Sequence, residues 1–450
     1  MNPNFPPNAR MIALDVLRDI HEKGAYTSLA LQNRLRANRL QPNDRRLVTS
    51  IVYTTLEHRE QIDFVLDSFM ERPTDDSVLR DILRISACQI LFHERVPDSA
   101  AVNEGVKLAK FTGKDHAIGF LNGVLRNLSR GKDAIQWPDR DTDIIQYLHV
   151  MGNMPVWLVE KLIAVYGPET AEQMILFKQS SDGMVVRPNM LRMTDDEFES
   201  LLRTKPWEWQ RGEVPHAYLI KGAVEIALDV DFQNGSFSIQ GQSSMLAAEA
   251  VQAKPGMRVL DACAAPGGKT AYMAESMQDT GRLFAWDVHE HRVKLLEAMK
   301  KRLRFENLRM SVRDAADFRP DLEASMDAVL LDAPCTGLGV LSDKPDLAYR
   351  LKESDLPSIV KTQALLLDTV SRYVKPGGAL VYSTCSILPE ENEEQIKAFL
   401  ETHPAFTVRP VPNSFPEAFR KHQNAYGLQL FTHRDGVEGF YICRLQRQRA

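Results

Sequence analysis

Acidic side chains follow successive predicted strands in the second half of the chain, where they could bind the hydroxyl groups of a nucleotide-like ligand. They are Asp261, Asp287, Asp314 and Asp332. A carboxylate can accept hydrogen bonds from both ribose hydroxyls, so Asp287, which ends the second of these strands, suits a ribose. Any one of the four could instead cap a helix N-terminus. Their repetition at four strand ends favours a ligand site.

A loop of small residues follows Asp261. The segment DACAAPGGKT (261–270) contains two glycines, which would let a ligand approach the backbone before the next helix begins. It differs from the dinucleotide motif G-x-G-x-x-G, and Cys263 stands where a P-loop needs glycine. The loop therefore predicts a nucleotide-like ligand with less phosphate, and Cys263 is expected to line its pocket rather than to attack a substrate.

Cysteines supply the strongest candidate nucleophiles. The five cysteines are Cys88, Cys263, Cys335, Cys385 and Cys443. Cys335 follows one predicted strand in LDAPCTGLG, and Cys385 ends the next in VYSTCS. A cysteine commonly packs as a small hydrophobe, which we expect of Cys88 within a helix and of Cys443 within the last strand. At a strand end over a ligand cleft, a thiol with a lowered pKa can instead act as a nucleophile.

Strands and helices alternate along residues 236–450 and predict an α/β domain. The apolar segments that we expect to be strands are 258–263, 282–287, 308–315, 327–334, 378–385 and 440–446. Right-handed crossovers between them give a largely parallel sheet with helices on both faces. Ligands bind such sheets outside the carboxyl ends of the strands, which is where the acids and the two candidate cysteines fall.

Residues 1–135 predict an all-helical bundle. Apolar residues recur at helical spacing in three sets: Ala13, Val16, Leu17 and Ile20; Ile62, Val65, Leu66 and Phe69; and Leu121, Val124, Leu125 and Leu128. The polar segment 131–143 is a candidate linker. Between 145 and 235, extended and helical segments predict a small α+β module, in which Thr194 and Glu197 form a capping box.

The composition is that of an ordinary globular protein. The chain has 450 residues, of which 44% are hydrophobic and 26% charged, and 55 basic and 60 acidic residues give a net charge of −5. These values exclude collagen, coiled-coil arrays and wholesale disorder, and a partner with phosphates would have to meet local basic patches. The sparse cysteines disfavour a disulfide scaffold and a C-x-x-C metal site. Without a recognisable signal peptide or apolar span, a cytoplasmic protein with no metal and no membrane partner is expected.

Three motifs together resemble those of the S-adenosylmethionine-dependent RNA cytosine-5 methyltransferases. They are DACAAPGGKT, LDAPCTGLGV and YSTCSILPEENE. FLNGVLRNL in the helical domain is similar to the NusB-like RNA-binding fold, and the pairing of the two resembles the methyltransferases of this family that act on small-subunit ribosomal RNA. The resemblance covers nearly the whole chain. It implies a NusB-like N-terminal bundle and a Rossmann-like C-terminal methyltransferase domain with a mostly parallel sheet.

The resemblance also implies roles for the candidate site residues. A loop of seven residues would lie against the methionine part of S-adenosylmethionine: Cys263, Ala264, Ala265, Pro266, Gly267, Gly268 and Lys269. Asp287 would hold the ribose, Asp314 would lie at the adenine, and Asp332 would lie between cofactor and base. Cys385 would be the nucleophile, and Cys335 would assist product release. A pair of cysteines indicates RNA, because the DNA cytosine methyltransferases attack from the Pro-Cys position.

The chain departs from the family pattern in two places that bear on the site. Gly241, in SIQGQSSM between Gln240 and Gln242, stands where relatives carry an acid. The second departure is the segment KPDLAY (344–349), where relatives tend to show His-Pro-Asp-Ile and a Trp. This segment lies in a loop that is expected to touch RNA.

The implied activity is methylation of carbon 5 of a cytosine in 16S ribosomal RNA by a monomeric enzyme. A thiolate that adds to carbon 6 makes carbon 5 nucleophilic, and a carboxyl such as Asp332 would stabilise the developing charge. The target base must leave its stack, so single-stranded or loop RNA is expected. Basic residues within 291–313 could form a phosphate track or a solvated helix face. The alternatives are the same chemistry on transfer RNA and a NusB-like RNA-binding assembly factor without catalysis.

Overall fold

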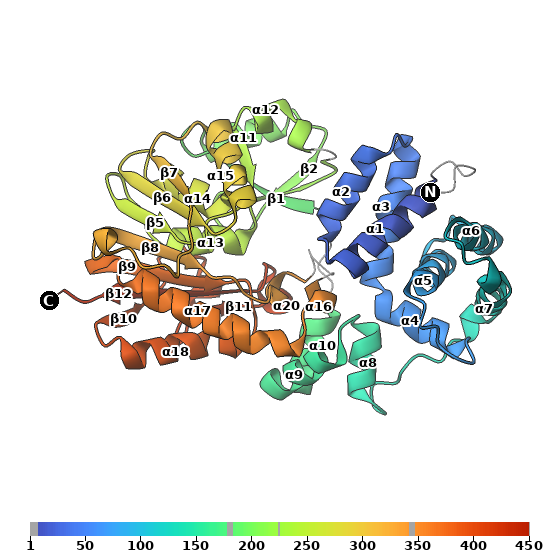
Figure 1. Cartoon of the computed structure of the whole chain (residues 1–450). Helices are drawn as coiled ribbons and strands as arrows, with labels where there is room; N and C mark the ends of the chain where they lie inside the picture. The colour runs from blue at the N-terminus through green and yellow to red at the C-terminus, as the bar shows by residue number, and fades with distance from the viewer. Residues whose placement is uncertain (1–7, 178–182, 224–225, 342–346, 450) are drawn as a thin grey trace. The chain divides into compact units, whose positions relative to one another are not determined.

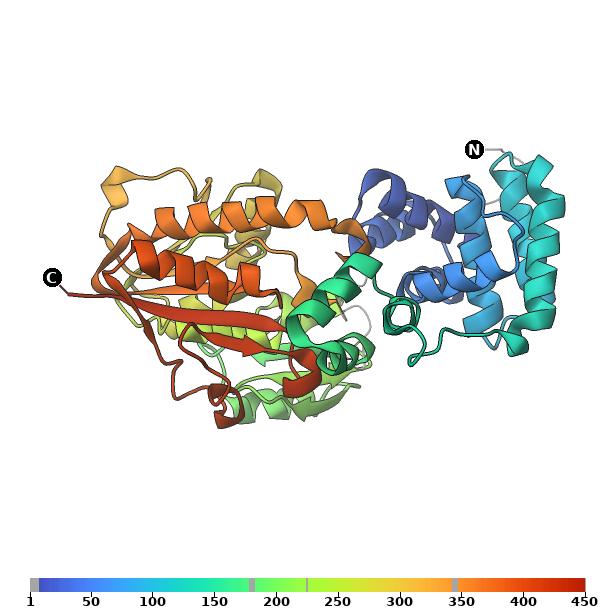
Figure 2. The ribbon, with the colours of Figure 1, turned by 90° about the horizontal axis from the view of Figure 1, so that it is seen from below.

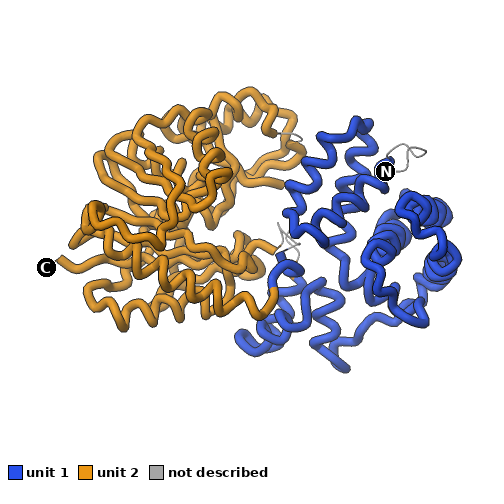
Figure 3. Tube along the Cα trace, in the orientation of Figure 1, with its two compact units in different colours: residues 1–176, 344–351 blue, residues 177–343, 352–450 orange. Residues whose placement is uncertain are grey.

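A computed structural model describes residues 8–177, 183–223, 226–341 and 347–449. Within it the chain forms two compact units (Figure 3). Unit 1 comprises residues 1–176 and 344–351, and unit 2 comprises residues 177–343 and 352–450. Each unit has its own arrangement of elements and is described separately.

Unit 1 is built from helices, and the apolar faces of the first seven meet in one core. Its main helices are α1 (Ala9–Lys23), α2 (Thr27–Ala37), α3 (Pro42–Glu57), α4 (Arg59–Ser68), α5 (Ser77–Phe92), α6 (Asp98–Phe111), α7 (Ile118–Gly131), α8 (Ile144–Met151), α9 (Val156–Tyr166) and α10 (Pro168–Leu176). The three predicted apolar sets lie in α1, α4 and α7, and all of their members are buried except Phe69, which is half-buried. Cys88 packs in the core from α5, as expected. The all-helical prediction for this region is therefore confirmed.

A short helix from the second half of the sequence also belongs to unit 1. This helix, α16 (Leu347–Arg350), contains the last three residues of the segment KPDLAY (344–349). The first three, Lys344 to Asp346, lie outside the described residues. The Tyr349 hydroxyl donates to the Asn153 carbonyl oxygen at 3.0 Å, and the Arg59 guanidinium lies 4.5 Å from the centre of the Tyr349 ring. These contacts hold Tyr349 in unit 1. Unit 1 also contains α8 to α10, which fall in the segment expected to form the α+β module.

Unit 2 contains a large sheet in which five neighbouring strands are parallel. Its strands are β5 (Arg258–Asp261), β6 (Arg282–Asp287), β7 (Leu308–Val312), β8 (Met326–Asp332), β9 (Val374–Thr384), β10 (Phe406–Arg409), β11 (Leu428–Leu430) and β12 (Phe440–Arg447). The order is β10-β12-β9-β8-β5-β6-β7, with β11 also paired to β12. Strand β12 runs antiparallel to each of its partners β9, β10 and β11. The mostly parallel sheet is as predicted, whereas β10 and β11 are additional to the predicted strands.

Helices cover both faces of this sheet because alternate residues of each buried strand point to opposite sides. On one face, Val259, Leu330 and Val381 pack with α13 (Gln242–Ala250), α14 (Gly268–Ser276) and α15 (Glu290–Leu303). On the other face, strand residues pack with α17 (Leu356–Ser371) and α18 (Glu393–Thr402) (Figures 1 and 2). Cys443 of β12 lies buried on this second face, as expected.

A small antiparallel sheet precedes the large one within unit 2. Its order is β2-β3-β1-β4, from β1 (Gly183–Pro188), β2 (Glu208–Arg211), β3 (Tyr218–Lys221) and β4 (Phe237–Ile239). Helix α11 (Asp195–Leu202) packs beside it and begins at the predicted capping box of Thr194 and Glu197. A short helix, α12 (Val230–Gln233), leads into β4. Across the described residues, no helix combines the length and the apolar character needed to cross a membrane.

Candidate functional site

The loop between β5 and α14 is fixed by the backbone of the neighbouring strands. The amide of Ala262 donates to the Leu330 carbonyl and that of Ala264 to the Trp286 carbonyl, at 2.9 and 2.7 Å. Gly267 precedes α14 with a φ of 111°, and a Cβ atom at this position would lie 2.8 Å from the Met299 side chain. The left-handed backbone conformation favours glycine here, and a Cβ atom would also displace the end of the Met299 side chain from α15.

Asp261, the last residue of β5, serves the interior of the fold. Its side chain is 1% exposed and accepts a hydrogen bond from the Thr270 hydroxyl at 2.6 Å, which fastens β5 to α14. Burial disfavours the ionised carboxylate and raises the pKa of Asp261 to about 7. The surroundings of Asp261 therefore indicate a role in holding the fold together.

Asp287 and Asp314 each stabilise the turn that follows their strand. One oxygen of Asp287 accepts from the His289 amide at 3.0 Å, and one oxygen of Asp314 accepts from the Ala316 amide at 2.9 Å. These are Asx turns, in which one side-chain oxygen holds the backbone amide two residues on. Asp287 is 3% exposed, whereas Asp314 is exposed.

Arg292 joins Asp287 to the glycine loop, a role that the sequence did not indicate. Its guanidinium donates to the Ala265 carbonyl at 2.9 Å and lies 3.4 Å from the Asp287 carboxylate. The sequence places Arg292 only among the basic residues within 291–313 that could form a phosphate track. Its contacts instead brace the loop that follows β5 against the end of β6.

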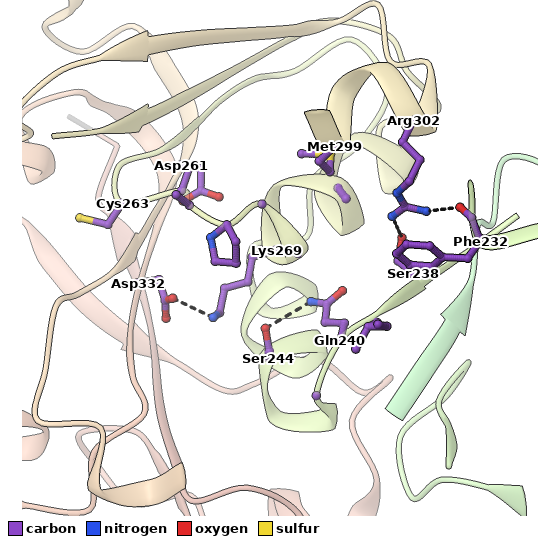
Figure 4. Close-up of a pocket in the computed structure, with 18 residues that line it drawn as sticks. Phe232, Ser238, Gln240, Ser244, Asp261, Cys263, Lys269, Met299, Arg302 and Asp332 are labelled. Carbon is purple, nitrogen blue, oxygen red and sulfur yellow. Dashed lines mark hydrogen bonds and ion pairs between the residues drawn. The ribbon is translucent and has the colours of Figure 1, made fainter. Parts of the chain in front are cut away.

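Asp332 connects the glycine loop to the strand that carries Cys385. One carboxylate oxygen accepts from the Lys269 ammonium at 2.7 Å (Figure 4). The other accepts from the Ser383 hydroxyl at 2.8 Å. Burial opposes the charge of Lys269, but Asp332, and after it Cys385, more than offset that effect, so the pKa of Lys269 is raised. A positive charge is thus held beside the sulfur of Cys385.

The two candidate cysteines meet at the carboxyl ends of β8 and β9. Asp332 pairs in register with Ser383, and just beyond this pair the sulfur atoms of Cys335 and Cys385 lie 3.3 Å apart. The Gly339 amide donates to the Cys385 carbonyl at 2.8 Å, which closes the loop after Cys335 over the end of β9. The contact with Cys385, together with burial, raises the pKa of Cys335 well above its usual value, so Cys335 keeps its proton.

Cys263 lies in the glycine loop and faces a different environment. Burial and the nearby carboxylates of Asp261, Asp332 and Asp287 raise the pKa of Cys263. A thiol that stays protonated is a poor nucleophile. The structure is therefore consistent with the expectation that Cys263 lines a pocket rather than attacks a substrate.

The residues beside the two cysteines are held by side chains of the PEENE segment. The Asn392 side chain accepts from the Thr384 hydroxyl at 2.5 Å and donates to the Ser386 carbonyl at 3.0 Å, so it grips the chain on both sides of Cys385. The carboxylate of Glu391 accepts from Thr336, which follows Cys335, and from Ser386, which follows Cys385. The glutamate and the asparagine stand in the quoted motif, but the motif does not show what they contact.

A pocket of about 340 Å³ opens beside the glycine loop, between the small and the large sheet of unit 2. Its walls include the backbone of 263–268, the Lys269–Asp332 pair and, from the small sheet, Ser238 and Gln240 (Figure 4). Arg302, a member of the predicted basic track, donates to the Phe232 and Phe237 carbonyls and to the Ser238 hydroxyl. It anchors the small sheet and is not free for a phosphate.

At Gly241, where the family resemblance implies an acid, a carboxylate from a distant part of the chain caps the following helix. Gly241 precedes α13, and the Glu438 carboxylate accepts from the amides of Gln242 and Ser243, at 3.2 and 2.9 Å. A Cβ atom on Gly241 would lie 2.1 Å from that carboxylate. Glu438 therefore caps α13 as an acid at position 241 would, and glycine leaves the room for it.

Comparisons with known proteins match both units of the chain. The family model described as 16S rRNA methyltransferase RsmB/F matches residues 248–446, and that of the NusB family matches residues 7–130. "Probable ribosomal RNA small subunit methyltransferase B" of Bacillus subtilis is 34% identical over 446 residues, with 98% of this chain and 99% of the relative covered. "Ribosomal RNA small subunit methyltransferase B" of Vibrio vulnificus is 29% identical over 447 residues, with 98% and 100% covered. The crystal structure of PH0851 is similar with a TM-score of 0.82 and 27% identity over 99% of both chains.

Proposed function

The chain belongs to the RsmB/F family of 16S rRNA methyltransferases, and from that premise we propose that it transfers a methyl group from S-adenosylmethionine to carbon 5 of a cytosine in small-subunit ribosomal RNA. The proposed route passes through a covalent adduct of the cytosine with Cys385. The observation that carries this proposal is the contact of two thiols, 3.3 Å apart, at the strand ends next to the glycine loop.

The residues around the pocket fit S-adenosylmethionine. The backbone of 263–268 offers hydrogen-bond donors, and the Lys269–Asp332 pair offers one positive and one negative charge. These groups suit the zwitterionic amino-acid end of the cofactor. Asp287 and Asp314 do not line this pocket. We propose that Asp287, which uses one oxygen in its turn, would hold the ribose hydroxyls from the end of β6, and that Asp314 would lie at the adenine. When bound, the cofactor supplies a methyl group on a positively charged sulfur.

Cys385 is suited to attack carbon 6 of the pyrimidine. The Lys269 ammonium stabilises a thiolate at Cys385, and Asp332 holds that ammonium in place. Addition of the thiolate makes carbon 5 nucleophilic, so one difficult step becomes two easier ones. Asp332, between the pocket and the thiols, would stabilise the charge that develops on the base.

Cys335 is suited to release the product. Since its raised pKa keeps it protonated, it is a donor to the neighbouring sulfur and a poor base. Once a base has removed the proton from carbon 5, the bond between carbon 6 and the Cys385 sulfur breaks. The Cys335 thiol then stabilises the departing thiolate by a hydrogen bond.

The test is methyl transfer from labelled S-adenosylmethionine to unmethylated 16S ribosomal RNA. We expect Cys385→Ala to abolish transfer, by about a thousandfold or more, while cofactor binding survives. Cys335→Ala should instead accumulate a covalent protein–RNA adduct that denaturing gels retain.

Two results would refute this assignment: transfer that persists in Cys385→Ala, or an adduct that forms through Cys335. If the label enters only transfer RNA, the substrate is transfer RNA and not ribosomal RNA. RNA binding without any transfer would favour the assembly-factor alternative.

A further inference from the structure

Glu391 is a buried carboxylate that contacts both of the loops that carry the candidate cysteines. It lies in the single turn Pro389–Glu391 after β9 and is 0% exposed. One of its oxygens accepts from the Thr336 amide at 2.9 Å and from the Gln363 side chain at 3.0 Å. The other accepts from the hydroxyl groups of Thr336, at 2.5 Å, and Ser386. An ionised carboxylate has about four acceptor sites, so this one is fully used.

The partners of Glu391 immediately follow the two thiols in sequence. Thr336 follows Cys335 and Ser386 follows Cys385, and their hydroxyl oxygens lie 3.0 Å apart. Gln363, which is also 0% exposed, bonds at the same time to the Pro334 carbonyl at 3.0 Å. One carboxylate thus joins the two loops on the far side of each thiol from its strand.

We propose that Glu391 is a positioning residue that sets the spacing between the Cys335 and Cys385 sulfur atoms. This inference deepens the proposed function and rests on it for its kinetic consequences. Its geometric content, the distance between two thiols, stands without it.

The two thiols depend on Glu391 to different degrees. Cys385 is also held by β9 and by Asn392, which contacts the residues on either side of it. The loop of Cys335 is tied at its ends, by the bonds from Ala333 to Ser383 and from Gly339 to Cys385, and Gln363 bonds to the Pro334 carbonyl. Glu391 accepts from both the amide and the hydroxyl of Thr336, which also lies against the Ser386 hydroxyl. Loss of the carboxylate is therefore expected to move Cys335 more than Cys385, and to slow release more than attack.

Two substitutions separate the bridge from its charge. Glu391→Ala removes all four hydrogen bonds and leaves buried donors unpaired. Glu391→Gln keeps an oxygen for the Thr336 and Gln363 N–H groups, and its amide can donate to the two hydroxyl groups, which rotate to accept. Asp327→Ala is the matched control, because Asp327 bridges the Arg258 amide and Lys375 at the opposite end of β8.

The first measurement reads the spacing directly in the full-length protein. Diamide takes two electrons and two protons from a pair of neighbouring thiols, which become a disulfide while its azo group becomes a hydrazine. The peptide pair joined through Cys335 and Cys385 is quantified by mass spectrometry. We expect its formation to slow about tenfold or more in Glu391→Ala and to stay within about threefold of the parent in Glu391→Gln and Asp327→Ala.

The second measurement reads the reaction. In Glu391→Ala, kcat should fall about tenfold or more with the KM for RNA and the cofactor Kd little changed, and the covalent adduct should accumulate. The Gln variant should recover most of kcat. The inference is overturned if Glu391→Ala forms the disulfide at the parent rate, or if Glu391→Gln is as impaired as Glu391→Ala. If the parent protein forms no adduct at Cys385, the proposed function fails, while the disulfide rates still decide the role of Glu391.

Discussion

The edge of the large sheet at which its parallel strands end is constructed differently at its two halves. At the ends of β5 and β6, the acids bond to groups that are near them in sequence: Asp261 accepts from the Thr270 hydroxyl, and Asp287 accepts from the His289 amide. At the ends of β8 and β9, side chains from separate loops hold one another, and the bonds of Glu391 to Thr336 span 55 residues. The difference teaches that these two acids of the proposed cofactor half hold groups near them in sequence, whereas the two thiol loops are joined by a side chain that is distant in sequence from one of them.

Asp332 is the residue at which the two halves meet, so its removal should have the largest effect. Asp332→Ala would leave the Lys269 ammonium, whose side chain is 13% exposed, without its partner. We expect a loss of about 3 kcal/mol in the free energy of unfolding, together with weaker cofactor binding and loss of transfer. Urea denaturation and calorimetric titration with S-adenosylmethionine measure the two effects.

Asp314→Ala is the matched control for this prediction, since it removes an exposed acid with a local turn bond. It should cost less than about 1 kcal/mol of stability. If Asp332→Ala weakened only one of cofactor binding and transfer, the two halves would not be joined through this side chain.

A smaller effect is expected from the titration of Asp261. Because its pKa is raised from 3.8 to about 7 in the folded protein, the folded state binds more protons than the unfolded state between these values. The free energy of unfolding therefore falls as the pH rises through this window. Asp261→Asn lacks this dependence and can still accept from Thr270. The stability of the Asn variant relative to the parent should rise by up to about 4 kcal/mol from pH 4 to pH 8.

Denaturation curves for the two proteins at several pH values test this sign. A difference that is flat with pH would show that the carboxyl is not held in its neutral form by burial. It would also remove the clearest electrostatic sign that β5 ends in a dry interior.

The smallest effect is expected at Cys263, which shares the edge but not the thiol contact. With its pKa raised by burial and by three carboxylates, it keeps its proton. Cys263→Ala should leave kcat within about threefold of the parent and change cofactor binding slightly, since a small side chain in the loop is lost. Methyl transfer under saturating cofactor is the measurement. A loss as large as that of Cys385→Ala would end the distinction between the two halves.

The contrast between the halves also explains what the sequence could predict. The apolar segments placed the parallel strands, and the acids and cysteines fell at their carboxyl ends as expected. Local signals, such as the capping box at Thr194, predict the structure well because they involve residues that are close in sequence. The contacts of Glu391 and Arg292, and the replacement of an acid at 241 by Glu438, join segments that are far apart in sequence. No spacing rule predicts them, because they depend on how loops pack after the sheet has formed.

The position of β12 in the sheet has a consequence for how the enzyme is made. This last strand is the second neighbour of β9, with Tyr441 opposite Thr384, and the Gly439 amide donates to the Gly339 carbonyl in the loop that follows Cys335. While the chain is still being translated, β9 has β8 alone beside it, and α13 has no Glu438 at its start. The strand β9, which precedes Cys385, and the loop after Cys335 therefore gain these contacts only after residues 438–447 have been translated. A chain that stops before residue 438 would keep all three motifs of the methyltransferase domain and lack the strand that pairs with β9 beside the proposed nucleophile.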